Sequence, residues 1–361
     1  MDKYNLKEHL KLNNNNKRLI DELKEDKLPV VVWGAGSMSY NLRKMLKHYG
    51  VSVNAIWVDG QISNSIIDDI PVLGFDTISK QYPVFNVVCG HSKYDLAQQI
   101  QKKYHQINRV FCFVNICYGL WEGISTDYIN NHLKEYTYSY NCLEDEKSRK
   151  CFAAYLNCKN NEDYNYLMPC CKDENVAYFD NPFFKVSDHE VYLDVGAYDG
   201  DTLKEFLGVV DNKFDKIIAI EPEMESYTKL SEYVKQINLK NIECYNNCCS
   251  DDNKELMFSL DKESSSLGSE GIIVKAYRID EQFSHEKISL IKINFLIGVE
   301  ETLIGASKIL KTLKPNLAIT VGFDEKAIMN IPKLIKEMNH DYKLSLRFAS
   351  PMPARLILFA Y

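Results

Sequence analysis

The chain has 361 residues, more than one domain usually holds, so its length favours two domains that each bury their own core. Hydrophobic residues make up 45% and charged residues 26%, and no apolar run approaches the ~18 to 20 residues that a membrane-spanning helix needs. A net charge of -7 without a basic cluster argues against binding to a phosphate backbone, so we expect no nucleic-acid partner.

The N-terminal residues 1–27 are polar, lack the apolar core of a signal peptide and are predicted to form a helical segment of a cytoplasmic protein. The eleven cysteines are an odd number without a secretory signal, which indicates reduced thiols rather than a disulfide framework. Their spacings do not match a standard zinc ligand set, so no metal site is predicted.

Residues 28–115 are predicted to form a small Rossmann-like α/β domain. Its first strand, at 29–33, is an apolar run that a glycine turn and then apolar residues at helical spacing follow. The alternation of strand and helix is typical of a parallel sheet. The later strands are predicted at residues 51–58, 84–89 and 110–114.

The turn Gly34-Ala35-Gly36, with Asp59 after the second strand, is similar to a dinucleotide fingerprint whose third glycine has become Ser39. The domain resembles more closely the N-terminal domains of sugar-modifying acyltransferases. Two interpretations stay open: the turn holds a nucleotide or nucleotide sugar, or the domain is a scaffold or forms homo-oligomers and keeps the turn for packing.

Residues 116–190 are predicted to be a helical connector packed against the second domain. Their composition shifts towards Tyr, Asn, Cys and charged residues, with helical periodicity over 145–156.

Residues 191–361 are predicted to form a second α/β domain. Its strands are predicted at 191–195, 216–220, 242–246, 255–260, 272–279, 290–295, 317–321, 342–347 and 355–359. Its helices are predicted at 202–208, 224–237, 300–313 and 327–338. Because the loop at 350–353 between the last two strands is too short for a crossover helix, we expect the sheet to end in an antiparallel hairpin.

The sequence D-V-G-A-Y-D-G-D-T at 194–202 lies where the first of these strands becomes a helix. Glycines there allow positive φ and close approach of a ligand, and a helix N-terminus offers N–H donors to a carboxylate. Glu221 ends the second strand, where a carboxylate can accept two hydrogen bonds from ribose hydroxyls. The carboxylates of Asp199 and Asp201 would repel a pyrophosphate, whereas they are compatible with the cationic sulfonium and ammonium groups of S-adenosylmethionine. The predicted cofactor is therefore S-adenosylmethionine.

The sequence resembles the FkbM methyltransferase family over about 220 residues, through the order of its motifs. The motifs are L-E-D-E at 143–146 with Ser148, Y-F-D at 178–180, V-Y-L-D-V-G-A-Y-D-G-D-T at 191–202, I-I-A-I-E-P at 217–222, K-A-Y-R-I-D at 275–280, I-K at 291–292, G-A at 305–306, L-R-F at 346–348 and L-F-A-Y at 358–361.

This resemblance implies a seven-stranded class I methyltransferase sheet and O-methylation of a sugar or polyol hydroxyl in surface-glycan biosynthesis. The acceptor would be a small molecule or a glycan. The resemblance also implies cofactor-binding roles for Asp194, Gly196, Ala197, Gly200, Asp201, Thr202, Glu221, Asn247, Ser250 and Asp251.

The chain departs from the family's motif I-K-x-D-x-E-G-A-E, which faces the transferred methyl group. Asn294 stands in place of the family's Asp and Leu296 in place of its first Glu, although a slip of one residue lets Glu300 supply one acid. The predicted catalytic residues are Lys292, Asn294 and Glu300. For Glu300 the alternative is a solvated residue favoured by the helix dipole, and for Lys292 it is a surface cation.

Three functional hypotheses stay open. The first is an active methyltransferase, and the second is a catalytically impaired, methyltransferase-like binding protein, which the missing acids favour. In the third, the N-terminal domain is a nucleotide-dependent oxidoreductase and the second domain regulates it.

Overall fold

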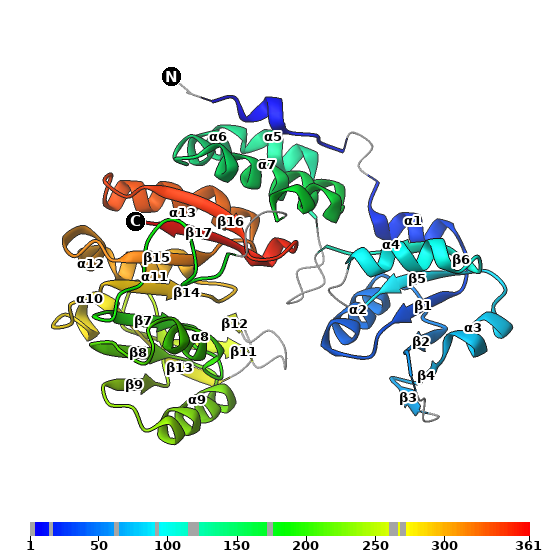
Figure 1. Cartoon of the computed structure of the whole chain (residues 1–361). Coiled ribbons are helices and arrows are strands. Elements are labelled where there is room, and N and C mark those ends of the chain that lie inside the picture. The colour runs from blue at the N-terminus through cyan, green and yellow to red at the C-terminus, as the bar shows by residue number, and fades with distance from the viewer. Residues whose placement is uncertain are drawn as a thin grey trace. The chain divides into compact units, whose positions relative to one another are not determined.

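The computed structural model describes residues 4–13, 17–60, 65–90, 94–114, 123–171, 176–259, 266–267 and 272–361. The chain divides into two compact units (Figure 1). The C-terminal unit comprises Met1–His9, Asn131–Ala153 and Cys170–Tyr361, and the N-terminal unit comprises Leu10–Asn130 and Ala154–Pro169. The predicted connector at 116–190 is thus shared between the two units. Its predicted start, after residue 115, lies outside the described residues.

The N-terminal unit contains a six-stranded sheet of order β3-β4-β2-β1-β5-β6, parallel except between β3 and β4. The strands are β1 (Val30–Trp33), β2 (Ala55–Trp57), β3 (Ser65–Ile67), β4 (Ile70–Leu73), β5 (Phe85–Cys89) and β6 (Ile107–Phe111). The residues of β1 are all buried, because helices cover both faces of the sheet. Apolar residues of α1 (Leu19–Glu25) and α2 (Ser37–His48) pack on one face, and those of α3 (Phe75–Gln81) and α4 (Tyr94–Lys103) pack on the other.

Among the described residues of the predicted helical segment 1–27, only α1 is an α-helix, and Leu6–His9 form a short 3-10 helix, η1. Residues 10–13 are irregular because side chains occupy their backbone groups. Asn157 accepts a hydrogen bond from the Lys11 N–H at 2.7 Å, and Asn160 accepts one from the Asn13 N–H at 2.6 Å. Amide side chains thereby replace the helical hydrogen bonds of this stretch.

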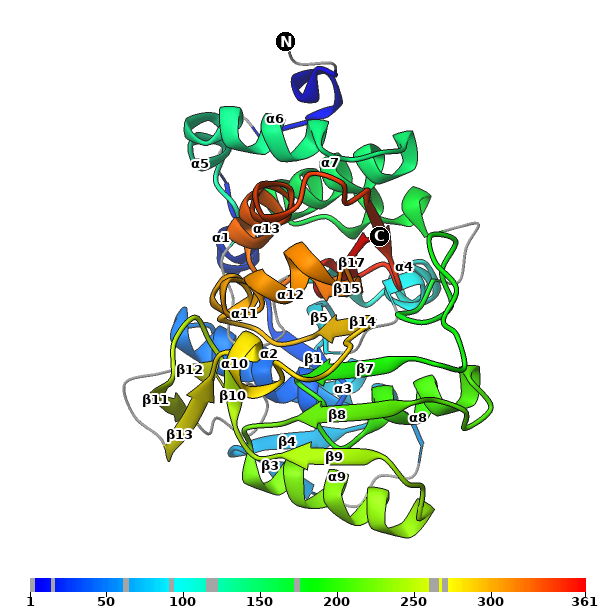
Figure 2. The same ribbon diagram turned by 90° about the vertical axis from the view of Figure 1, so that its left-hand side faces the viewer.

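The C-terminal unit contains a seven-stranded sheet of order β16-β17-β15-β14-β7-β8-β9. The strands are β7 (Val191–Val195), β8 (Lys216–Ile220), β9 (Ile242–Tyr245), β14 (Leu290–Ile293), β15 (Asn316–Thr320), β16 (Leu344–Phe348) and β17 (Leu356–Ala360). Figure 2 shows β14, β7, β8 and β9 side by side. All pairs are parallel except β15–β17 and β16–β17, so the predicted α/β sheet with a terminal antiparallel hairpin is confirmed.

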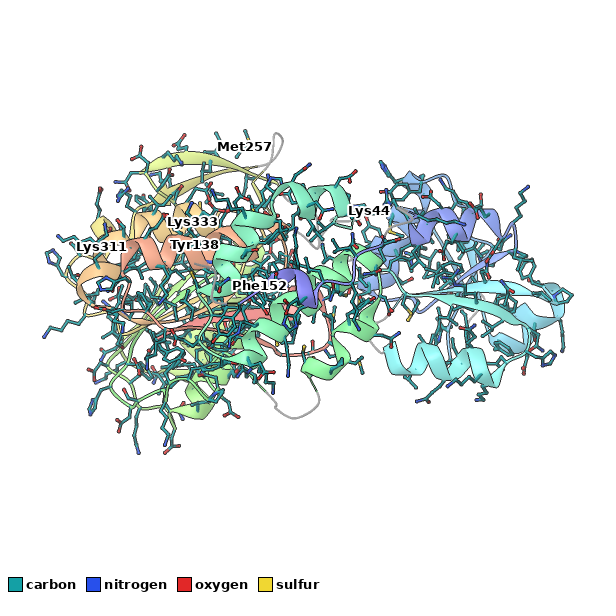
Figure 3. All side chains as sticks on the ribbon, turned by 90° about the horizontal axis from the view of Figure 1, so that it is seen from above. Lys44, Tyr138, Phe152, Met257, Lys311 and Lys333 are labelled. Carbon is teal, nitrogen blue, oxygen red and sulfur yellow. The ribbon has the colours of Figure 1, made fainter. Side chains whose placement is uncertain are left out.

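The helices of this unit are α8 (Asp201–Val209), α9 (Met224–Ile237), α10 (Ile279–Gln282), α11 (Val299–Gly305), α12 (Ser307–Thr312), α13 (Glu325–Met338) and α6 (Leu133–Asn141); α7 (Glu146–Asn161) begins in this unit and ends in the other. The predicted helix at 300–313 is two helices, α11 and α12, with a break at Ala306. Lys311 of α12 and Lys333 of α13 extend outward, whereas Phe152 of α7 is fully buried (Figure 3). None of the helices in the described ranges is long and apolar enough to cross a bilayer.

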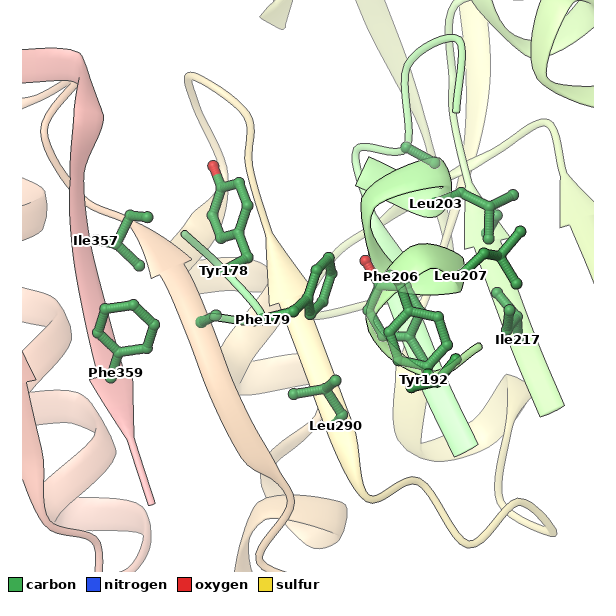
Figure 4. Packing of buried hydrophobic residues seen from close by; sticks show 14 of the residues in the cluster. Tyr178, Phe179, Tyr192, Leu203, Phe206, Leu207, Ile217, Leu290, Ile357 and Phe359 are labelled. Atoms are coloured by element: carbon green, nitrogen blue, oxygen red, sulfur yellow. The ribbon is translucent and has the colours of Figure 1, made fainter. Parts of the chain in front are cut away.

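An aromatic cluster fixes α8 on the sheet (Figure 4). Tyr192 of β7 stacks on Phe206 of α8, with ring centroids 4.5 Å apart, and Phe179 packs edge-on against both rings. These large buried rings hold the first turn of α8 in register with the end of β7.

A smaller sheet of order β10-β13-β11-β12 lies in the same unit. It comprises β10 (Cys248–Cys249), β11 (Lys254–Ser259), β12 (Ser266–Leu267) and β13 (Ile272–Tyr277). The strand predicted at 255–260 corresponds to β11, and its last residue lies outside the described residues. The strand predicted at 272–279 ends earlier, at Tyr277, because Ile279 begins α10.

The motif at 143–148 holds the edge strand β16. Asp145 accepts hydrogen bonds from the backbone and the hydroxyl group of Ser148 at 2.8 and 2.7 Å, and it pairs with Arg347 at 3.2 Å. The Ser148 hydroxyl oxygen accepts a hydrogen bond from the Leu346 N–H at 2.8 Å. The start of α7 therefore covers the backbone of an exposed sheet edge.

Candidate functional site

The turn between β7 and α8 requires glycine at its first position. Gly196 has a φ of 79°, and a Cβ placed on it would lie 2.5 Å from the backbone oxygen of Asn294. Gly200 caps α8 with a φ of 87°. The backbone N–H groups of Gly196 and Ala197 both donate to the Ile220 carbonyl at 3.0 Å, so they brace the turn against β8.

A buried ion pair lies beneath this turn. Lys292 of β14 is the direct neighbour of Asp194 in the register of the two parallel strands, and both side chains are fully buried. The Lys292 ammonium donates to Asp194 at 2.9 Å and to the Gly196 carbonyl at 2.7 Å. The second oxygen of Asp194 accepts the Thr202 hydroxyl at 2.8 Å. One network thus joins two strands, the turn and the first turn of α8.

The burial of Lys292 shows that its interpretation as a surface cation is wrong. Burial, the largest single effect, lowers the pKa of the ammonium group, but Asp194, Tyr178 and Asp201 together raise that pKa by more, so the net shift is upward. Lys292 therefore stays charged and holds the turn, and it does not serve as a proton acceptor. Asp194, predicted to bind cofactor, supports the turn from below.

Glu221 follows β8 and is 7% exposed. One carboxylate oxygen accepts the Tyr198 N–H at 2.8 Å and the other accepts the Glu223 N–H at 2.9 Å. Burial raises the pKa of Glu221 to about 7, although these two hydrogen bonds act in the opposite direction. The β7–α8 turn and the Glu221 carboxylate are therefore directly connected.

The first turn of α8 places Asp201 at the surface and Thr202 inside. The Thr202 N–H donates to the Asp201 carboxylate at 2.7 Å, so this backbone donor already has an acidic partner. A negative charge at a helix N-terminus is favourable. Of these two predicted cofactor residues, Asp201 is the one that a ligand can reach.

The predicted adenine-side turn, 247–251, contains the short strand β10, and three of its five residues are partly exposed. Asn247 and Ser250 are buried, and a Cβ on Gly305 would lie 2.0 Å from the Ser250 carbonyl oxygen. Asp251 is partly exposed and pairs with Lys254 at 2.6 Å, a contact that lowers the pKa of its carboxyl group. Asp251 is thus the only one of the three predicted residues with a partly exposed side chain.

The turn after β14 carries no carboxylate at the two family positions. Asn294 donates its backbone N–H to the Val195 carbonyl at 3.1 Å, and Ile297 is half-exposed. Glu300 of α11 accepts a hydrogen bond from Asn330 of α13 at 2.8 Å. The structure therefore brings Asn294 to the β7–α8 turn and gives Glu300 a partner on another helix.

Three further polar residues, Tyr178, Thr320 and Glu205, belong to this region and were not among the residues that the sequence predicted as catalytic. The Tyr178 hydroxyl shares a hydrogen bond of 2.7 Å with Thr320, the last residue of β15, and Tyr178 lies beside the strand ends in Figure 4. Glu205 of α8 accepts the Phe179 N–H, and burial followed by the Asp201 charge raises its pKa. Its second oxygen, Oε1, is buried and has no hydrogen-bond partner among the described residues. Tyr178 lies in a motif that carries the resemblance, whereas no sequence signal marks Glu205.

Among the described residues no group of three His, Cys, Asp or Glu side chains is placed to hold a metal ion. A cavity of about 440 Å³ lies at the opposite end of β16, near Tyr4, Asn141 and Lys336, and none of the predicted site residues lines it.

Comparison with known proteins identifies the fold. No family model matches the sequence, and no curated protein matches it. The crystal structure of Methyltransferase FkbM from Methylobacillus flagellatus KT is similar to this chain with a TM-score of 0.75 and 17% identity, over 98% of this chain and 95% of that chain. The similarity shows that almost the whole chain has this methyltransferase's fold, whereas the sequence motifs predict it for about 220 residues.

Two further solved structures match about half of the chain. Precorrin-6y C5,15-methyltransferase from Geobacter metallireducens has a TM-score of 0.33 and 13% identity, over 49% of this chain and 81% of that chain. SMU.1697c from Streptococcus mutans, described as a putative methyltransferase in complex with SAH, has a TM-score of 0.32 and 17% identity, over 48% and 88% of the two chains.

Proposed function

We propose that the protein is an S-adenosylmethionine-dependent methyltransferase of the FkbM type that methylates a hydroxyl group of a sugar or polyol. The fold shared with a methyltransferase supports the reaction class. The sequence motifs support the family and, by resemblance alone, a sugar acceptor and a role in the assembly of surface polysaccharide in the cytoplasm.

The arrangement of Glu221 is the observation that carries the proposal. Each carboxylate oxygen accepts one backbone N–H, from Tyr198 and Glu223, and retains a lone pair. Two oxygens fixed in this way at the end of β8 suit the two neighbouring hydroxyls of a ribose. The positive φ of Gly196 and the absence of a side chain there let the turn pack closely against the Asn294 backbone oxygen.

The protein's own residues bind and orient the reactants. S-adenosylmethionine supplies an electrophilic methyl group when it is bound. The Asp194–Lys292 pair fixes the Gly196 turn. The partly exposed Asp199 and the exposed Asp201 place negative charge at the N-terminus of α8, where it suits a cationic ligand. In methyl transfer, fixed in-line positioning supplies most of the acceleration.

A base is needed only to remove the proton of the acceptor hydroxyl. Asn294 cannot accept it as a carboxylate would, and Glu300 is bonded to Asn330. We propose Glu205 for this role, because its raised pKa and its buried, unpaired oxygen suit a proton acceptor better than either predicted residue.

Calorimetry with S-adenosylmethionine tests cofactor binding. We expect the wild-type protein to bind and Glu221→Gln to lose at least tenfold in affinity, because the amide replaces one accepting oxygen by a donor. Glu243→Gln is the matched control, since Glu243 lies on the neighbouring strand β9 and pairs with Lys216 at 2.8 Å. Absence of binding by the wild-type protein at millimolar ligand would refute the proposal.

A methyltransferase-like protein that binds the cofactor without turnover is the second candidate, and the apolar turn after β14 favours it. The two candidates differ in one product. Release of S-adenosylhomocysteine in the presence of a glycan extract eliminates the second candidate. Cofactor binding without release from any extract eliminates the first.

A further inference from the structure

Two cysteines of the C-terminal unit lie in direct contact away from the cofactor site. Cys151 lies on α7 and Cys170 ends the 3-10 helix η4 (Met168–Cys170). The Cys151 thiol donates a hydrogen bond to the Cys170 sulfur. Both are free thiols in the structure.

The two thiols have different surroundings. Cys151 is fully buried, whereas Cys170 is partly exposed. The hydrogen bond from Cys151 lowers the pKa of Cys170 against the effect of burial, and the cationic Lys147 and Lys150 lower it further. The same contact and burial raise the pKa of Cys151. A partly exposed thiol with a lowered pKa, in contact with a second thiol, is the arrangement found in peroxide-sensitive cysteine pairs.

The pair also occupies a particular place along the chain. The C-terminal unit includes the chain up to Ala153 and again from Cys170, and the stretch Ala154–Pro169 between them belongs to the N-terminal unit. Cys151 and Cys170 therefore lie at the two ends of this stretch. A bond between them would join the points where the chain leaves the C-terminal unit and returns to it.

We propose that Cys170 and Cys151 are a peroxide-sensitive modification site that forms a reversible disulfide bond. The Cys170 thiolate attacks one oxygen of hydrogen peroxide, the O–O bond breaks, and hydroxide leaves and takes up a proton to form water. The Cys151 sulfur then attacks the sulfenic acid of Cys170. A sulfur–sulfur bond forms, the Cys151 proton is lost, and a second water leaves. Hydrogen peroxide is the oxidant, and a thiol such as glutathione reverses the reaction.

Peptide mapping of the full-length protein tests this pair directly. The reduced protein is treated with hydrogen peroxide, the remaining thiols are blocked with N-ethylmaleimide, and the peptides are analysed without reductant. We expect a linked peptide pair that joins Cys151 to Cys170, with a mass lower by two hydrogen atoms, which dithiothreitol separates. Cys170→Ser and Cys151→Ser each remove the link, and Cys171→Ser retains it.

A second measurement on the wild-type protein does not depend on the folding of variants. Limiting iodoacetamide at neutral pH should alkylate Cys170 several-fold faster than its neighbour Cys171, whose pKa burial raises to about 11. The proposal is overturned if Cys170 reacts no faster than Cys171. It is also overturned if peroxide links Cys170 to Cys171, or if Cys151 and Cys170 stay unlinked while the buried Cys89, in contact with Cys112 in the N-terminal unit, becomes oxidised.

Discussion

Both units contain a strand–glycine–helix turn, but different buried residues pack next to the two turns. In the C-terminal unit, the residue two positions before Gly196 is Asp194, and its register partner on the next strand is Lys292. In the N-terminal unit, the residue two positions before Gly34 is Val32, and its register partner is Val88. All four side chains are fully buried. One turn therefore rests on an ion pair and the other on an apolar contact.

Each turn also has an acidic residue nearby, Asp59 after β2 and Glu221 after β8, and these two residues differ in burial and in their hydrogen bonds. Asp59 is exposed and accepts the indole N–H of Trp33 at 3.3 Å. Glu221 is buried and accepts two backbone N–H groups. The local sequence pattern is similar, but only the C-terminal turn has a fixed and polar support.

This difference indicates which turn is built for a ligand. Valine pairs suffice to pack a strand against a helix, whereas burying an ion pair carries a large desolvation cost. The ammonium of Lys292 offsets that cost partly by bonding the Gly196 carbonyl, so its charge sets the shape of the turn. We infer that the Gly34 turn serves packing and the Gly196 turn serves binding.

The largest expected effect comes from Lys292→Met, which leaves the Asp194 carboxylate buried without a counter-charge. We expect the C-terminal unit to lose about 3 to 5 kcal/mol of unfolding free energy. Trp33 and Trp57 lie on β1 and β2 of the N-terminal unit, and the sequence ranges of the C-terminal unit contain no tryptophan, so tryptophan fluorescence does not report the C-terminal unit. Urea unfolding should show an earlier far-UV circular dichroism transition and an unchanged fluorescence transition.

The control for this change is the double variant Asp194→Asn with Lys292→Met, which removes both charges and should recover part of the loss. An equal loss in the single and double variants would show that the cost lies in packing. It would then remove the distinction between the two turns.

The next largest effect is expected for Gly196→Ala. A φ of 79° is strained for alanine, and the new Cβ would lie 2.5 Å from the Asn294 oxygen, so we expect a loss of about 2 to 3 kcal/mol and of cofactor binding. Gly34→Ala is the matched variant, with a φ of 108° and a closest contact of 3.2 Å. Calorimetry with S-adenosylhomocysteine should show unchanged binding for Gly34→Ala, and weakened binding would contradict the comparison.

A smaller effect concerns pH. Because the pKa of Glu221 is about 7 and ribose hydroxyls donate to the ionised carboxylate, the affinity for S-adenosylhomocysteine should fall about tenfold between pH 8 and pH 6. Calorimetry across this range measures the slope, and Glu221→Gln should flatten it. A wild-type affinity that is independent of pH would show that the carboxylate does not contact the ligand.

The same shift affects the stability of the unliganded protein in the opposite sense. The folded-state pKa of Glu221 lies above the ordinary value of 4.5, so the folded protein holds this proton more tightly than the unfolded chain does. The resulting stabilisation of the folded state is fully present below pH 4.5 and is lost as the pH rises through 7. The Glu221→Gln variant should therefore gain stability relative to the wild type between pH 5 and 8, as measured by the thermal unfolding midpoint.

The smallest effect is expected for Asp59→Asn in the N-terminal unit. Its exposed carboxylate makes a single long contact to Trp33, so the change should cost less than about 1 kcal/mol. Urea unfolding followed by tryptophan fluorescence measures it. A loss of 2 kcal/mol or more would show that Asp59 supports its turn as Glu221 supports the other.

The sequence predicted the parts of the fold that local patterns determine. The strands at 191–195 and 216–220 have the predicted bounds, because their apolar runs end at Gly196 and Glu221. The helix at 224–237 also has the predicted bounds and ends where Asn238 adopts the left-handed conformation. The predicted strand at 51–58 is only Ala55–Trp57, since residues 51–54 are irregular and the Asn54 side chain accepts the Val30 N–H.

The supports of the site were not predictable from local patterns. Nothing near Lys292 in the sequence shows that it faces Asp194, because their contact depends on the register of β14 and β7. The same holds for Glu205, whose burial depends on the segment that carries Phe179. The sequence thus predicted which residues surround the turn, and only the structure showed that Asp194 and Lys292 lie beneath it.

A crystal structure of the protein soaked with S-adenosylhomocysteine would show both turns at once. We predict ligand density at the Gly196 turn, with the ribose hydroxyls within hydrogen-bond distance of Glu221, and no density at the Gly34 turn. Density at the Gly34 turn, or a ribose at the Gly196 turn that does not contact Glu221, would contradict it.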